Sequence, residues 1–197
     1  VCSSDLIGSL NGYLIACGVS PEELIEVWLD PQFRRLQGLE STLKGWMGHY
    51  KLRRPLAVTV TDTLTLKPWI ARDGEITWRH LAASCAVPLA MPQVKIDGRW
   101  CTDGGLLAPL PVWAAVELGA TEIEGLQVLG KFPSPVLGPF VKMFRGVFGK
   151  PDSVPEGVTL RVREPGERLG NLKSTLWGTQ ADVERWIEMG KRDARGW

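Results

Sequence analysis

Apolar residues recur along the chain at two spacings, one typical of helices and the other of strands. Helices are predicted where apolar positions recur roughly every three to four residues, and strands where short β-branched runs lie between turn residues. The predicted helices cover residues 7–17, a segment beginning at Pro21, and residues 33–50, 80–85, 111–118 and 180–194. The predicted strands cover residues 56–61, 69–72, 75–78, 94–96, 99–102, 123–129 and 158–162. Strands that alternate with helices favour an α/β fold with a mainly parallel sheet.

Turn residues refine this pattern at several element boundaries. Ser20 followed by Pro21 is a typical helix start, because proline has no amide hydrogen to lose in the first turn. Asp73-Gly74 and Asp97-Gly98 each lie between two short strand-like runs, so both predict a β-hairpin. Residues 130–157 are rich in proline and glycine and resemble a linker.

Composition excludes several classes of protein. The 197 residues are 44% hydrophobic and carry a formal net charge of +1, so neither disorder nor a nucleic-acid partner is indicated. No apolar run approaches the roughly 20 residues of a membrane span. The four cysteines lack metal-ligand spacing, and the chain has only two histidines, so no metal or cofactor is expected. Free thiols are typical of a reducing compartment, and we expect a cytoplasmic or membrane-peripheral location.

The first six residues are unusual for the start of a protein. The chain begins at Val1, and VCSSDL is also the translation of a common sequencing-adapter end (GTG TGC TCT TCC GAT CT). We therefore expect residues 1–6 to be non-native, the coding sequence to begin near Ile7, and a first strand to be missing. Residues 7–197 are then one domain truncated at its N-terminus.

Three runs in the middle of the chain have a specific order and spacing. They are ASCAVPLAMPQV at 83–94, IDGRW at 96–100 and TDGGLLAPLPV at 102–112. Together they resemble the patatin-like phospholipase family, which carries an SSAxP…FPPV…DGxxYxDGGxxxxxP run. IGSLN at 7–11 is similar to the tail of the family's nucleophile elbow, usually GTSxGxLN, and the segment 172–194 is similar to its closing helix.

The resemblance implies a patatin-type three-layer α/β/α sandwich that hydrolyses lipid acyl esters with a Ser–Asp dyad. It assigns Asp103 as the catalytic base, with Gly104 and Gly105 shaping its loop and Gly8 following the elbow. An aspartate after a strand and before two glycines also fits a purely structural Asx-turn, and the surrounding match favours the catalytic role. The implied partner is a lipid or acyl-ester substrate, with possible contact to a membrane surface, and no cofactor or metal is implied.

The chain departs from the family pattern at the nucleophile. Aligning residues 7–11 with the elbow puts Leu6 where the family has serine, and no GxSxG or glycine-rich oxyanion loop occurs in the sequence. A hydrolase without nucleophile and oxyanion donors cannot form an acyl-enzyme. We therefore expect this chain to be inactive although its intact parent is a hydrolase. The alternative is a non-catalytic patatin-like domain that binds lipid or a partner protein.

Three further features have both a functional and a structural interpretation. His80 could complete a Ser-His-Asp triad, although a structural hydrogen bond at a helix start is the favoured interpretation. Lys51, Arg53 and Arg54 form a small basic patch typical of a solvated surface. Residues 138–149 combine aromatic and basic residues, as a lipid-facing lid segment does, but a surface helix packed on the sheet is favoured.

Overall fold

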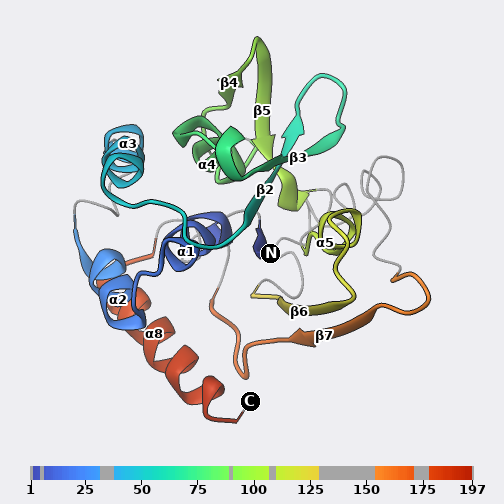
Figure 1. Ribbon diagram of the computed structural model, residues 1–197. Coiled ribbons are helices and arrows are strands. Elements are labelled where there is room, and N and C mark those ends of the chain that lie inside the picture. Colours follow the sequence, from blue (N-terminus) through green and yellow to red (C-terminus); the bar gives the residue numbers. More distant parts are fainter. Residues whose placement is uncertain are drawn as a thin grey trace.

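The chain folds as helices and strands around one central strand, β2 (Leu56–Asp62), which is buried along its whole length (Figure 1). The computed structural model describes residues 2–4, 7–31, 38–88, 91–106, 110–128, 154–170 and 178–196. The predicted mixed α/β fold class is confirmed.

Strand β2 is paired along both of its edges. One edge pairs with the antiparallel strand β3 (Pro68–Arg72). The other edge pairs with β1 (Cys2–Ser4), which is parallel to it, and with β5 (Arg99–Asp103), which is antiparallel. β5 also pairs with β4 (Val94–Ile96), in the hairpin that the Asp97-Gly98 turn predicts. This hairpin prediction is confirmed.

The prediction of a mainly parallel sheet is wrong for this five-stranded sheet. Only the β1–β2 pair is parallel, while β3, β4 and β5 join their neighbours in antiparallel pairs. For β2 and β3 the cause is connection length, because the loop of residues 63–67 between them is too short for the crossover that parallel strands need.

Two other strand predictions are also wrong. A strand does precede residue 7, because Cys2–Ser4 pairs with the first half of β2. The expected partner of β3 at residues 75–78 is not a strand; the chain instead passes through a short 3-10 turn into α4 (Trp78–Ser84). Asp73, with φ of +43°, turns the chain there, and its carboxylate accepts a hydrogen bond from the Leu56 amide at 3.0 Å.

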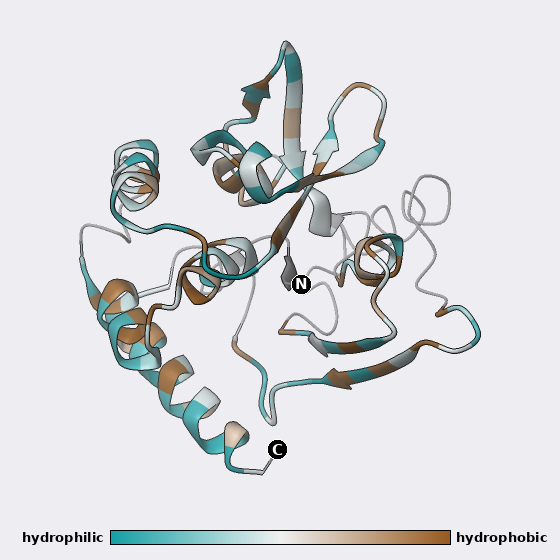
Figure 2. Cartoon of the chain, viewed as in Figure 1, coloured by the Kyte–Doolittle hydropathy of each residue, from teal (hydrophilic) through white to brown (hydrophobic). Residues whose placement is uncertain are grey.

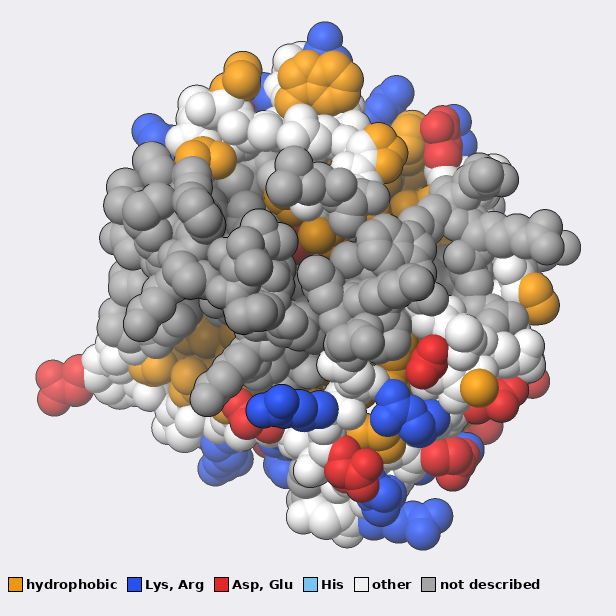
Figure 3. All heavy atoms as spheres, turned by 180° about the vertical axis from the view of Figure 1, so that it is seen from behind, with side chains coloured by type: hydrophobic (Ala, Val, Ile, Leu, Met, Phe, Trp, Pro, Cys, Tyr) orange, Lys and Arg blue, Asp and Glu red, His pale blue; other side chains and the backbone are white. Residues whose placement is uncertain are grey.

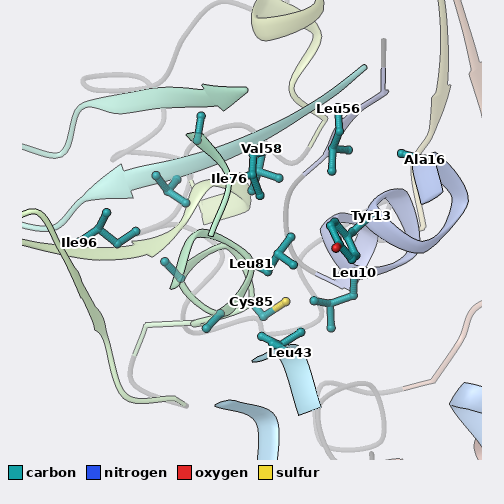
Figure 4. Packing of buried hydrophobic residues seen from close by; sticks show 14 of the residues in the cluster. Leu10, Tyr13, Ala16, Leu43, Leu56, Val58, Ile76, Leu81, Cys85 and Ile96 are labelled. Atoms are coloured by element: carbon teal, nitrogen blue, oxygen red, sulfur yellow. The ribbon is translucent and has the colours of Figure 1, made fainter. Parts of the chain in front are cut away.

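The hydrophobic core lies between β2 and three helices. α1 (Ile7–Cys17) matches its predicted bounds, and Leu10, Tyr13 and Leu14 on it are buried. Leu81 of α4 and Leu43 of α3 (Leu39–His49) complete this cluster beside β2 (Figure 4). A β-branched strand under apolar helix faces removes most apolar side chains from water, which is the main stabilising term of such a fold.

The remaining elements flank this core. α2 (Pro21–Leu29) begins as predicted, with Ser20 capping it in a reciprocal capping box. α5 (Val112–Glu117) precedes a separate parallel pair, β6 (Glu122–Leu126) and β7 (Thr159–Arg163). α8 (Gln180–Ala194) matches its predicted bounds, and hydrophobic and hydrophilic stretches alternate along it (Figure 2). Among the described helices, none is long and apolar enough to cross a bilayer.

Candidate functional site

Asp103 is the last residue of β5 and one of the few buried carboxylates in the described part of the chain. Its side chain is 3% exposed. One carboxylate oxygen, Oδ1, accepts a hydrogen bond from the Gly105 amide at 2.9 Å, and the Asp103 amide donates to the Ala86 carbonyl at 3.1 Å. A buried carboxylate that accepts a hydrogen bond from a backbone amide has a fixed position, as a general base requires.

Gly104 lies against Thr59 in the middle of β2. A Cβ at position 104 would lie 3.0 Å from the Thr59 hydroxyl oxygen and 3.4 Å from its carbonyl oxygen. The neighbour is part of a buried strand, so it cannot move aside as an exposed side chain would. Glycine at this position therefore lets the chain leave β5 tightly against the sheet.

The ends of β1 and β5 approach one another across Thr59. Because β3 occupies one edge of β2, β1 and β5 share the other edge, and they run in opposite directions along it. Ser4 pairs with Val58 and Asp103 pairs with Val60. Two residues of strand span about 7 Å, so the two carboxyl ends converge on one place in the sheet.

The chain passes from β1 into α1 beside Asp103, with two residues between the strand and the helix. Residues 5 and 6 form the link between Ser4 and the helix, and their structure, including that of Leu6, lies outside the described residues. Gly8 lies in the first turn of α1 and is partly exposed. A sharp strand-to-helix turn is the backbone form of a nucleophile elbow.

The C-terminal end of α4 closes the site from a third side. The Ala86 carbonyl accepts hydrogen bonds from the Asp103 amide and, at 2.5 Å, from the Thr102 hydroxyl. The Ser9 hydroxyl of α1 lies 3.7 Å from the Cys85 sulfur. These contacts join α4 to the end of β5 and to the first turns of α1.

Two serines on the helices near this place are inaccessible to a substrate. Ser9 and Ser84 are both fully buried. The His80 ring instead contacts Thr77. Its Nδ1 accepts a hydrogen bond from the Thr77 amide at 3.1 Å and lies 2.9 Å from the Thr77 hydroxyl. Burial lowers the pKa of His80, although the nearby carboxylates of Asp97 and Glu75 oppose this shift. The favoured interpretation of His80 as a structural helix-start residue agrees with these bonds.

A groove of about 800 Å³ runs along α4 beside β4. Ala82, Ala86, Met91 and Val94 contribute apolar lining, and charged side chains such as Lys95 lie along it. Ala86 is among the lining residues, and its carbonyl accepts the hydrogen bond of the Asp103 amide.

Several predicted features lie outside the part of the chain that the structure describes. They are the candidate nucleophile position 6, the candidate lid at 138–149, and three leucines expected as walls of an acyl pocket, namely Leu89, Leu107 and the side chain of Leu106. The cysteines at 17, 85 and 101 are free thiols, as expected. The described residues contain no cluster of side chains that could hold a metal ion.

Sequence reasoning missed two residues of this site, Thr59 and Ala86. Thr59 belongs to a strand that was predicted only as buried core, and Ala86 acts through its backbone carbonyl. The signal for Thr59 is a polar residue at the centre of a buried strand, whereas nothing in the type of residue 86 indicates its role.

Comparison with known families agrees with this geometry. A family model described as patatin-like phospholipase matches residues 7–116, more than half of the chain. The matched region contains α1, the central strand β2 and Asp103, and it ends within α5. No curated protein matches the chain significantly.

Proposed function

The chain belongs to the patatin-like phospholipase family, and from that premise we propose that it is the domain of a lipid acyl hydrolase in which Asp103 is the catalytic base. The observation that carries the proposal is the convergence of the ends of β1 and β5 across Thr59. A Ser–Asp dyad needs a base within hydrogen-bond reach of the residue in the elbow. The backbone brings the two segments to within about two strand residues of one another.

The proposed reaction is acyl transfer through a covalent intermediate. In the intact domain, Asp103 takes the proton of the elbow serine as its oxygen attacks the ester carbonyl, and the alcohol leaves with that proton. Water then attacks the acyl-enzyme with Asp103 again as base, which releases the fatty acid and regenerates serine. Burial of Asp103 supports this role, because the surrounding structure fixes the position of the carboxylate and limits its exposure to water.

Gly104, Gly105 and Gly8 support the reacting groups in this proposal. The Gly105 amide holds Oδ1 of Asp103, and the close approach of Gly104 to Thr59 fixes where β5 ends. Gly8 lies in the first turn of α1, directly after the position that we assign to the elbow. We further propose a three-layer α/β/α arrangement and a cytoplasmic or membrane-peripheral location for the intact domain.

The groove along α4 is our candidate for the acyl chain. Its lining includes the apolar residues Ala86 and Met91, and the Ala86 carbonyl accepts a hydrogen bond from the Asp103 amide. A groove with apolar lining close to the proposed base suits a substrate with a hydrocarbon tail.

The residue at position 6 favours a second candidate function. Leucine cannot act as a nucleophile, so a chain with native Leu6 would be a patatin-like domain that binds lipid or a partner protein without turnover. The DNA sequence upstream of codon 7 in the source separates the two. If the codons before Ile7 complete a GTSxG motif with Ile7 and Gly8, the hydrolase is supported. If Leu6 is native, the binding domain is supported.

Activity is tested most simply by restoring the elbow. Residues 1–6 are replaced by a patatin-type strand, glycine-rich loop and elbow ending in serine at position 6, and hydrolysis of p-nitrophenyl esters is measured. The matched control carries the same graft with leucine at position 6. The proposal predicts hydrolysis by the serine form alone, and a folded serine form without activity would overturn it.

A further inference from the structure

Two loops at one end of the sheet carry exposed apolar and cationic side chains next to one another. They are the β2–β3 loop of residues 63–67 and the β4–β5 hairpin. We call the exposed residues Leu64, Lys67, Lys95, Arg99 and Trp100 the tip surface. Hydrophobic and basic side chains are mixed at this end of the molecule, seen from behind at the top of Figure 3.

The two loops are held together by hydrogen bonds and form one surface. The amide and the hydroxyl of Thr63 both donate to the Trp100 carbonyl, each at 2.8 Å. Asp62 accepts hydrogen bonds from the amides of Leu64 and Thr65 through Oδ1, each at 2.9 Å. A loop fixed in this way presents Leu64 outward without the entropy loss that ordering a mobile loop on binding would cost.

The exposure of the two apolar side chains is unusual for a surface that contacts only water. Leu64 is 84% exposed and Trp100 is 47% exposed. The Lys95 ammonium lies 5.8 Å from the centre of the Trp100 ring, on the same side of the hairpin. Tryptophan beside lysine, with a leucine that can enter the acyl region, is the side-chain set of a membrane interface.

The charges at this end favour an anionic partner. Lys67, Lys95 and Arg99 are exposed, against one exposed carboxylate, Asp97. The second carboxylate, Asp62, is buried and accepts hydrogen bonds from two amides of the β2–β3 loop. Basic residues near a bilayer attract anionic lipid headgroups, so the exposed charge complements such a surface.

The tip surface lies at the same end of the sheet as the candidate site. β1 and β2 are parallel, and their C-terminal ends therefore point toward the same end of the sheet. Asp103 pairs with Val60, two residues before the end of β2, and the hairpin extends beyond it. Docking through the tips brings this end of the domain to the bilayer.

We propose that the tip surface docks the domain on anionic lipid bilayers, with Leu64 and Trp100 entering the interface and the three basic side chains contacting headgroups. This inference deepens the proposed function, because a lipid ester in a bilayer reaches the enzyme only where the enzyme meets the bilayer. It does not depend on turnover, since docking uses none of the reacting groups.

Vesicle co-sedimentation of the full chain tests the proposal directly. The protein is expected to sediment with vesicles of phosphatidylcholine and phosphatidylglycerol, less with phosphatidylcholine alone, and less at high salt. Lys67→Gln is expected to weaken binding to the anionic vesicles about fivefold, and Leu64→Ser and Trp100→Ala are each expected to weaken it by at least as much. Leu126→Ser and Arg54→Gln change an exposed apolar and an exposed basic residue elsewhere, and each serves as a matched control.

Three outcomes would overturn this inference. They are no sedimentation with anionic vesicles, equal losses in the controls and in the tip variants, and a chain that self-associates in solution through the tip surface. Size-exclusion chromatography with light scattering detects the last of these. If the vesicles bind as expected but the chain with the restored elbow remains inactive, docking stands and the proposed hydrolase activity fails.

Discussion

Ser4 and Asp103 pair with two residues of β2, Val58 and Val60, that lie one on each side of Thr59 on the same strand edge. One pair is parallel and the other is antiparallel, and the two strand ends therefore meet. This meeting brings the C-terminal end of β1 close to Asp103, as the proposed dyad requires. It also explains the glycine at position 104, where any side chain would press on Thr59.

The chain as it stands is expected to show no esterase activity above background on short-chain p-nitrophenyl esters. Position 6 is leucine, and the buried hydroxyls of Ser9 and Ser84 cannot reach a substrate. Initial rates with and without protein give the measurement. Turnover that disappears in the Asp103→Ala variant would contradict the assignment of position 6, because another residue would then be the nucleophile.

Replacing Gly104 by alanine is expected to destabilise the fold by about 1–3 kcal/mol, because the added methyl group overpacks against Thr59. Gly45→Ala in α3 is the matched control. No atom lies within 4 Å of its added Cβ, and alanine there should stabilise the helix by about 1 kcal/mol. Urea denaturation followed by circular dichroism measures both changes. Equal and small effects would show that the approach of Gly104 to Thr59 does not constrain the fold.

His80 is expected to make stability depend on pH below neutrality. Burial lowers its pKa in the folded state below the ordinary value of 6.5, so the unfolded chain binds more protons between these two values. The free energy of unfolding should therefore decrease as the pH falls from about 6.5 toward the lower pKa of the folded state.

His80→Gln removes this titration and keeps an acceptor for the Thr77 amide, since glutamine serves at this position of a capping box. Urea denaturation of both proteins at a series of pH values gives the comparison. The variant should lose less stability than the parent over the pH window just below 6.5. Parallel curves in this window would refute the contribution of His80, because the depressed pKa of Asp62 acts only at lower pH.

The elements that the sequence predicted well are those with local signals. α1 and α8 match their predicted bounds because apolar periodicity and caps act within one segment. The β4–β5 hairpin was predictable from Asp97-Gly98, where φ is positive at both residues. The strand β1 was not predictable, because Cys-Ser-Ser has no strand pattern and pairs only where β2 offers an open edge. The direction of β5 relative to β2 also depends on this distant pairing.

The candidate site likewise combines features that could be predicted from the sequence with features that could not. Asp103 could be predicted because a carboxylate between a strand and two glycines lies within a specific motif. The contact of Gly104 with Thr59 and the bonds to the Ala86 carbonyl could not be predicted, because they join segments brought together only by the tertiary fold. The hairpin expected at Asp73-Gly74 failed for a related reason: Asp73 bonds to the Leu56 amide instead of turning β3 back on itself.

The central claim, that Asp103 is the base, is tested most directly by Asp103→Asn in the chain with the restored elbow and Ser at position 6. Asparagine keeps an acceptor for the Gly105 amide and hence the loop, but it cannot take a proton from serine. The account predicts that kcat on p-nitrophenyl esters falls about a hundredfold or more while the melting temperature changes little. A folded Asp103→Asn protein as active as its parent would mean that Asp103 is only a turn residue.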